Sequence, residues 1–515
     1  MQKKTKGAPT PDDVIGTRTP RHVVKYYYRY EFRRRCGEYK FLISSVILSI
    51  FGVLQVVFPP YDMMLYYRIK MTPGLPPFDW WLDPPDQVIA KVYIFNVTNP
   101  VEFSNGSDKK IKLKEVGPII YREKLRHDNV AFNDNSTLSY TANRSLIYLP
   151  DRNPVDLLKQ TITMPNLPIL VIPSFFYDSP FYVRLGVNLM IRRLKTETFK
   201  TATVEDFLWN MTDPLMDTSR SLAPGLVPIS NFGILTKVYR EMQDNLTVLI
   251  GPGFASRDFF KIDRINGNDF VPLNGDCRFK MADSSEGVAY HQSVSRNDTI
   301  KYYRKTFCGI ANLFYAGDTE RYGLSAYRFE LDNATYDRSR RGDCYAGAPE
   351  LPGGLRDVSS CNFDTSIAAS NPHFLHAEPA LIESFEGLEP DPALHTSYID
   401  VEPVTGVPLE GSAKCQINLA VKDLSGFTSR LHKFSNLNIP LAWIEYKQEG
   451  LPDKIKWLLY ILVNVMPAFQ IVLASATFLS SAIFLLVFLI KQRRLQANLK
   501  ANKALAFEKE TFLSK

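Results

Sequence analysis

The chain has 515 residues, 45% hydrophobic and 22% charged, which is the balance of a folded protein and excludes a disordered one. Its net charge of +7 comes from its two ends, because residues 1–40 hold 11 Lys/Arg against 4 Asp/Glu and residues 491–515 hold 7 against 2. The segment between them is net acidic. We therefore expect no nucleic-acid partner.

The first long apolar segment runs from Phe41 to Phe58, and Gln55 is its one strongly polar side chain. It is long enough to cross a bilayer. Forty residues precede it and no small-residue cleavage site follows, so we interpret it as an uncleaved signal anchor. This predicts a cytosolic tail over residues 1–40 and a transmembrane helix over residues 41–60. Cys36 follows three arginines and is a candidate for palmitoylation, with a plain cytosolic thiol as the alternative.

Residues 61–456 contain no repeat and no long Gly/Ser linker, which favours one large domain. The stretch Lys91 to Pro100 is apolar on both faces, as in a strand buried between layers. Residues 110–114, 327–331 and 416–421 alternate with period two and predict half-buried strands.

Helical signals gather between Pro180 and Met216. Apolar residues recur at helical spacing from Phe181 to Leu194, and Thr203 to Asp206 form a capping-box pattern. The pattern as a whole predicts an antiparallel β body with a helical insert.

The second apolar segment, Trp457 to Ile490, has no charged side chain and is too long for one straight span. We place the crossing near residues 469–490, and we expect Trp457 to Pro467 to be an interfacial or ectodomain-packed lead-in. Pro467 would bend a continuous helix there. Residues 491–515 form a second tail. Because both tails are basic, both are predicted to be cytosolic.

Two further features agree with this orientation. All eight N-glycosylation sequons lie between the spans, at Asn96, Asn105, Asn135, Asn143, Asn210, Asn245, Asn297 and Asn333. Five of the six cysteines lie there too, in what would be an oxidising compartment. The region between the spans is therefore predicted to be a glycosylated ectodomain.

Several motifs in this region coincide in order: VYIFNVTNP at 92–100, EVGPIIYRE at 115–123, DFLWNMTDPL at 206–215, NPHFLHAEP at 371–379 and YIDVEPVTGVPL at 398–409. Together with the two spans, they resemble the class B scavenger receptor family. The resemblance implies an α+β membrane protein whose two transmembrane helices flank a large ectodomain. That ectodomain would have an antiparallel β-barrel-like core, a hydrophobic tunnel and an apical helical bundle.

The resemblance also implies a basic apical cluster that captures anionic lipid ligands. In this sequence it would comprise Arg192, Arg193, Lys195 and Lys200, with Arg192 and Lys195 sharing a helix face at i,i+3 spacing. An ordinary solvated helix face is the alternative.

By position in the family pattern, Cys308 would pair with Cys361 and Cys277 with Cys344. Cys415 would then be unpaired, but the family's second cysteine near Cys344 is absent here, so a bridge from Cys277 to Cys415 stays open. His373 and His376 fall within a family segment and are interpreted as structural residues, with no metal site.

These features predict a cell-surface receptor that binds lipids or lipoprotein particles and transfers fatty acid, sterol or carotenoid to the membrane. A homo-oligomer is compatible with this function. The alternatives are a lysosomal membrane sorting receptor for a lumenal protein and a chemosensory co-receptor for hydrophobic odorants. The chain contains no nucleotide-binding, metalloprotease or hydrolase motif, so we expect neither an enzyme nor a cofactor.

Overall fold

The computed structural model describes residues 20–68, 71–85, 87–225, 227, 230–236, 238–239, 243–251, 257–272, 278–281, 283–304, 309–336, 351–362 and 365–513. The chain divides into two compact units. One unit comprises residues 1–65 and 464–515, and the other comprises residues 66–463.

The first unit is a pair of long helices, α1 (Pro20–Val57) and α13 (Met466–Leu513). A short helix, α2 (Pro60–Arg68), follows α1, and a π-helical turn (Ile461–Val465) precedes α13. That turn lies directly before Pro467, whose missing N–H prevents a regular α-helix from continuing through it. Two segments, Tyr39–Val57 and Asp453–Asn498, are apolar and long enough to cross a membrane. Both predicted spans are therefore helical.

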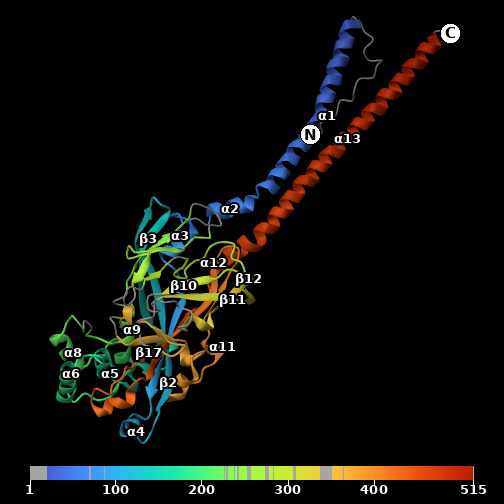
Figure 1. Ribbon diagram of the computed structural model, residues 1–515. Coiled ribbons are helices and arrows are strands. Elements are labelled where there is room, and N and C mark those ends of the chain that lie inside the picture. Colours follow the sequence, from blue (N-terminus) through green and yellow to red (C-terminus); the bar gives the residue numbers. More distant parts are fainter. Residues whose placement is uncertain are drawn as a thin grey trace. The chain divides into compact units, whose positions relative to one another are not determined.

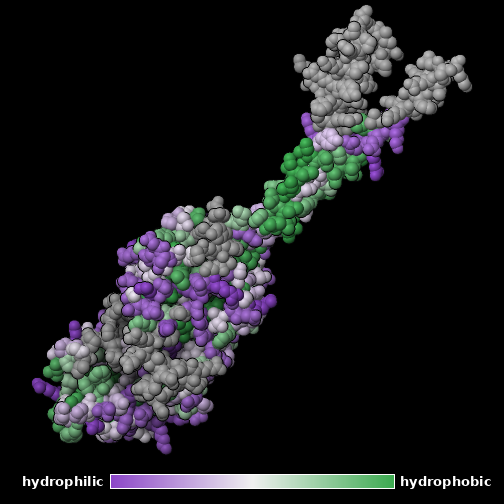
Figure 2. Space-filling view, turned by 45° about the horizontal axis from the view of Figure 1, so that its top comes forward, coloured by the Kyte–Doolittle hydropathy of each residue, from purple (hydrophilic) through white to green (hydrophobic). Residues whose placement is uncertain are grey.

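Small and polar side chains line the contact between α1 and α13. The Ser481 hydroxyl lies 2.7 Å from that of Ser49 and 3.1 Å from that of Ser45. A Cβ atom on Gly52 would lie only 2.9 Å from the Phe478 ring, so the glycine allows that ring to approach the α1 backbone. Large apolar side chains face outward, and Figure 2 shows them as a hydrophobic band along the helix pair. This distribution is typical of two helices that associate within a bilayer.

The second unit is built on one large sheet with the strand order β10-β11-β12-β16-β17-β18-β1-β2-β3-β6-β7, to which β13, β14 and β15 are attached. Neighbouring strands are antiparallel except for β15, which is parallel to β2. The long strands are β1 (Val88–Val97), β2 (Ile111–Asn133), β3 (Thr137–Tyr148), β11 (Gly309–Arg321), β12 (Leu324–Leu331), β17 (Pro408–Ala420) and β18 (Asn438–Gln448). The shorter ones are β6 (Asn245–Leu249), β7 (Ile262–Ile265), β10 (Ile300–Arg304), β13 (Arg356–Asp357), β14 (Ile367–Ser370), β15 (Phe385–Glu386) and β16 (Tyr398–Val401). Two further two-stranded ladders pair β4 (Thr161–Pro165) with β5 (Phe199–Thr203) and β8 (Phe270–Pro272) with β9 (Arg278–Lys280).

The predicted buried strand is β1, which lies between β18 and β2 in the middle of the sheet. Val92, Ile94 and Phe95 are each almost completely buried. Since consecutive residues of a strand point to opposite faces, the burial of both Ile94 and Phe95 means that both faces of β1 are covered. Lys91 to Pro100 therefore has the environment that its composition predicts.

The other three predicted strands are present in β2, β12 and β17, but one prediction about their faces is wrong. On β17 the polar Gln416 and Asn418 are fully buried. They are satisfied by bonds across the sheet, because the His373 N–H donates to Gln416 at 2.7 Å and Asn418 donates to the Ser370 hydroxyl at 3.0 Å. Alternation of polar and apolar residues along a strand does not predict hydrogen-bond partners from other segments of the chain.

A closed barrel is not seen within the described ranges. The ladder has two ends, β10 and β7, which do not pair directly with each other, although the backbone of Ser284 and Ser285 hydrogen-bonds to both. The sheet is nevertheless strongly curled, because side chains of the end strand β10 reach β2 in the other half of the strand order. The expectation of a β-rich ectodomain is confirmed, while closure into a barrel by direct strand pairing is not.

The helical insert contains α5 (Leu167–Phe175), α6 (Phe181–Arg193), α7 (Val204–Trp209), α8 (Pro214–Leu222) and α9 (Ile234–Thr236). Thr203 caps α7 as predicted, since its side chain accepts the Asp206 N–H at 3.1 Å. Within the body, α5, α6 and α8 gather at the end away from α3 and α12 (Figure 1). The remaining helices are α3 (Pro76–Leu82), α4 (Pro100–Asn105), α10 (Pro379–Glu383), α11 (Pro392–His395) and α12 (Asp453–Tyr460).

Candidate functional site

Helix α6 carries an exposed apolar face. Val187 and Ile191 point into the core, while the opposite side exposes Phe181 (72%), Tyr182 (73%), Leu185 and Leu189. Residues spaced by three, four or eight positions share one side of a helix, so these four side chains form a continuous stripe. A stripe of this kind costs free energy in water and marks a surface that contacts something apolar.

Arg192 and Arg193 lie in the last turn of α6 and are both exposed. Positive charge is favourable at a helix C-terminus, where backbone carbonyls are unpaired. In the part of the chain that the structure describes, neither arginine is paired with a carboxylate. We call Phe181, Tyr182, Leu185, Leu189, Arg192 and Arg193 the α6 surface.

Lys195 is exposed beside the α6 surface, but it lies beyond the end of the helix. The Lys195 N–H bonds to the Arg192 carbonyl and the Thr196 N–H to the Ile191 carbonyl, which together close the helix in a Schellman motif. Lys195 has φ +50°, a left-handed conformation that usually favours glycine. The prediction that Arg192 and Lys195 share one helix face at i,i+3 spacing is therefore wrong, because the helix ends between them.

Lys200 does not belong to this surface. It lies on β5, is half-buried, and donates from Nζ to the Thr212 carbonyl at 2.5 Å. Its ammonium group is engaged in holding β5 to the segment before α8. Of the four basic residues predicted to form a cluster, three remain available to a ligand.

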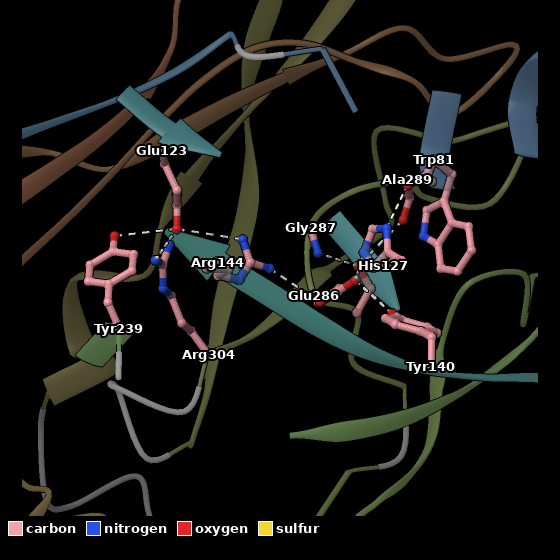
Figure 3. Close-up of polar contacts among 11 residues, drawn as sticks. Trp81, Glu123, His127, Tyr140, Arg144, Tyr239, Glu286, Gly287, Ala289 and Arg304 are labelled. Atoms are coloured by element: carbon pink, nitrogen blue, oxygen red, sulfur yellow. Dashed lines mark hydrogen bonds and ion pairs between the residues drawn. The ribbon is translucent and has the colours of Figure 1, made fainter. Parts of the chain in front are cut away.

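A second polar site lies inside the body (Figure 3). Glu123 on β2 is almost fully buried and accepts from Arg304 on β10 at 3.1 Å and from the Tyr239 hydroxyl at 3.3 Å. Arg144 on β3 lies 3.7 Å from the same carboxylate. The Arg304 guanidinium also stacks 3.7 Å above the Tyr446 ring of β18. These contacts join strands that are far apart in the sheet.

Arg144 links Glu123 to a second buried carboxylate, Glu286, at 3.3 Å. The Tyr140 hydroxyl donates to Glu286 at 2.6 Å, and His127 Nε2 lies 3.4 Å from it. Burial by itself would raise the pKa of Glu286, but the contact with His127 and the charge of Arg144 outweigh it and lower the pKa to about 2. Trp81 on α3 stacks on the His127 ring at 4.2 Å.

We call Glu123, Arg144, Arg304, Glu286 and His127 the interior ion network. Each buried carboxylate meets a guanidinium, so the cost of removing the charges from water is offset by pairing. The interior ion network was not predicted from the sequence. Its members come from separate segments, and charged residues on a strand are normally expected to face solvent.

His373 is buried and uses both ring nitrogens within the protein. Nε2 lies 2.8 Å from Glu115, and Nδ1 accepts the Glu389 N–H at 3.0 Å. The His395 ring stacks on it at 4.6 Å, and burial lowers the pKa of His395 to about 4. His376 is exposed. Within the described residues no group of three metal-ligating side chains is found.

The predicted modification sites have different environments. Seven of the eight sequon asparagines are exposed, whereas Asn96 is half-buried and its side-chain oxygen accepts the Thr163 N–H at 2.7 Å. Cys361 is disulfide-bonded. Cys415 is a free thiol, so the alternative bridge to Cys277 is not formed. Cys277, Cys308 and Cys344 lie outside the described residues, as does the side chain of Cys36.

Comparison with known proteins covers most of the chain. The family model described as the CD36 family matches residues 42–492. Scavenger receptor class B member 1 of Rattus norvegicus is 28% identical over 417 residues, which is 79% of this chain and 80% of the relative. Lysosome membrane protein 2 of Homo sapiens is 26% identical over 389 residues, or 75% and 79% of the two chains. With its two apolar terminal helices and its sheet-rich ectodomain, this chain belongs to the CD36 family.

Proposed function

We propose that this protein is a cell-surface receptor that captures lipid or lipoprotein particles on the α6 surface and passes hydrophobic cargo to its membrane. The observation that carries the proposal is the exposed apolar stripe of α6 next to Arg192 and Arg193. A lipid particle presents anionic headgroups above an apolar interior, so it would engage both halves of this surface. A relative named as a scavenger receptor supports the same role.

Transfer would follow an apolar conduit through the ectodomain, as the family resemblance implies. Each CH₂ group removed from water contributes about 0.8 kcal/mol, so a route lined by apolar side chains lowers the barrier between particle and bilayer. No catalytic step is needed, and we propose a receptor without enzyme activity or cofactor. Such a conduit would have to avoid the interior ion network, because charged groups do not solvate an acyl chain.

The proposed topology places residues 1–40 and 491–515 in the cytosol and the glycosylated ectodomain, residues 61–456, at the cell surface. The α6 surface would be distant from the membrane, since α6 and α12 lie at different ends of the body and α12 leads into α13 (Figure 1). A particle could then dock without reaching the bilayer itself. We also propose bridges from Cys308 to Cys361 and from Cys277 to Cys344, and palmitoylation at Cys36.

Charge reversal tests this function. In cells that express the full chain, Arg193→Glu with Lys195→Glu should reduce uptake of fluorescent lipid from anionic particles several-fold, with unchanged surface level by biotinylation. Lys109→Glu with Lys110→Glu is the matched control, because both lysines are exposed but lie before β2. Uptake equal in the two double variants would remove the α6 surface from the function.

The apolar half of the α6 surface is tested separately. Leu185→Ser with Leu189→Ser removes two exposed leucines and should weaken particle binding roughly 30-fold, given roughly 1 kcal/mol lost at each of the two positions. Mass spectrometry of lipids that copurify with the protein would identify the cargo. Absence of any copurifying lipid would count against the conduit.

A second candidate function is a lysosomal sorting receptor, since the relatives include lysosome membrane protein 2. An exposed helix face can also bind a lumenal protein. Tagged protein in intact cells decides between the two, because predominant overlap with lysosomal markers would favour sorting. A chemosensory co-receptor would use the same α6 surface with a hydrophobic odorant as cargo.

A further inference from the structure

Helix α12 has two apolar faces with different surroundings. Ile455 and Leu459 are buried against Leu324, Ala326 and Leu409, so one face belongs to the core of the body. The other face exposes Trp457 (66%) and Leu458, and Ile461 continues it beyond the end of α12. The helix is thus held on the body while half of its apolar surface is uncovered.

The turn between β11 and β12 extends this uncovered surface. Tyr322 and Gly323 form its two-residue loop, with φ of +57° and +74°. The left-handed region is uncommon for a tyrosine, so this turn presents the Tyr322 ring at some cost in backbone free energy. The Tyr322 hydroxyl packs on Gly450, and Lys456 Nζ lies 4.6 Å above its ring.

Helix and turn are in contact, because the Tyr460 ring lies against Gly323, where a Cβ atom would be 3.7 Å from it. The rings of Trp457 and Tyr460 meet edge to face at 6.2 Å. We call the exposed set of Tyr322, Trp457, Leu458, Tyr460 and Ile461 the juxtamembrane surface. Its members are aromatic or aliphatic, and the charges of α12 are confined to Asp453, Lys454 and Lys456 at its start.

The chain itself indicates what covers this surface. Residues Ile461–Val465 connect α12 directly to α13, which contains the second span. About 20 residues cross a bilayer, so the charge-free run from Trp457 to Ile490 has a surplus at its N-terminal end, where α12 lies. Tryptophan and tyrosine are enriched where a protein meets lipid headgroups.

We propose that the juxtamembrane surface lies in the headgroup region of the bilayer that this chain spans. The ectodomain then has a lipid contact of its own in addition to its two covalent connections to the spans. That contact involves two elements distant in sequence, the β11–β12 turn and α12, and it restricts how the body can tilt over the membrane.

Tryptophan quenching tests the proposal on the full chain in single-copy nanodiscs. Trp457 is the one exposed tryptophan of the five, which makes it the natural probe. Lipids with a nitroxide on the headgroup, or at carbon 5 of the acyl chain, should quench part of the fluorescence, and lipids labelled at carbon 16 should quench less. Trp457→Phe should abolish most of the headgroup quenching, whereas Trp209→Phe should preserve it.

Two variants with a tryptophan at a new position are the controls. They distinguish a loss of the fluorescent probe from a loss of contact between the protein and the lipid. In the Trp457→Phe background, Leu458→Trp should restore the quenching and Val101→Trp should not, since Val101 is as exposed as Trp457 (67% and 66%) but lies on α4. Equal quenching of wild type and Trp457→Phe would overturn the proposal. So would quenching that appears only in nanodiscs with two copies, which would instead mean that a second molecule covers the surface.

Discussion

At the scale of single residues, Glu286 shows how the interior ion network depends on charge. The folded state lowers the pKa of this carboxyl to about 2, below its ordinary value of 4.5. A depressed carboxyl pKa stabilises the fold above the ordinary pKa, and that stability is lost as pH falls from about 4.5 to about 2. The contribution is on the order of 3 kcal/mol.

Glu286→Gln should therefore lower stability at neutral pH by about 3–5 kcal/mol, because Arg144 and His127 lose a charged partner in the interior. The pH dependence of unfolding between 4.5 and 2 should also become shallower. Thermal unfolding of the full chain in detergent, measured from pH 7 to pH 2, gives both quantities. Glu383→Gln, at an exposed position on α10, should change neither.

Substitutions at Lys195 should have opposite effects on stability and on particle binding. Its left-handed backbone is unfavourable for a lysine by about 1 kcal/mol, so Lys195→Gly should raise the free energy of unfolding by that amount. The same change removes a charge beside the α6 surface and should reduce particle uptake. Lys195→Arg should leave both unchanged. If the glycine variant took up particles normally, the lysine would have no role in binding.

At the scale of elements, Gly52 governs how closely α1 and α13 approach. A leucine there would overlap the Phe478 ring and separate the helices. In a chain with Ser49→Cys and Ser481→Cys, whose hydroxyl oxygens lie 2.7 Å apart in the native protein, oxidation should form an intramolecular crosslink. Adding Gly52→Leu should reduce the crosslinked fraction several-fold.

Val53→Leu is the matched control for this test, because Val53 is exposed on the outer side of the helix pair. It should leave crosslinking unchanged. Efficient crosslinking with leucine at position 52 would mean that the pair does not depend on close packing at Gly52.

Helices and strands could be predicted where a pattern in consecutive residues indicates them. The two spans follow from length and apolar composition, and β1 from a run that is apolar on both faces. The end of α6 was not predictable, because no glycine marks it and Lys195 takes the left-handed position instead. Because Lys195 itself has the left-handed conformation, it lies beyond the helix and not on the helix face that its spacing predicts.

At the scale of the whole molecule, the proposed orientation places every sequon on one side of the membrane. Glycosidase treatment should increase the mobility of the full chain, and epitope tags at either terminus should become accessible only after permeabilisation. A tag accessible on intact cells would contradict the orientation.

The sequons should differ in occupancy. Asn297→Gln should increase mobility, because Asn297 is exposed, whereas Asn96→Gln should have little effect. The Asn96 side chain is half-buried and bonded to the Thr163 backbone, which leaves little room for a glycan. An equal shift from both substitutions would show that Asn96 is also modified.

The sequence by itself determined the two spans, the basic ends, the sequons and the strands β1, β2, β12 and β17, because bilayer thickness and strand pleating impose patterns on consecutive residues. Only the tertiary structure decided that Gln416 and Asn418 are buried and that Glu123 and Glu286 meet Arg144 and Arg304. The physical reason is that a polar group can be buried only where a partner satisfies it, and here those partners come from distant segments of a curled sheet. A pattern of neighbouring residues contains no information about such partners.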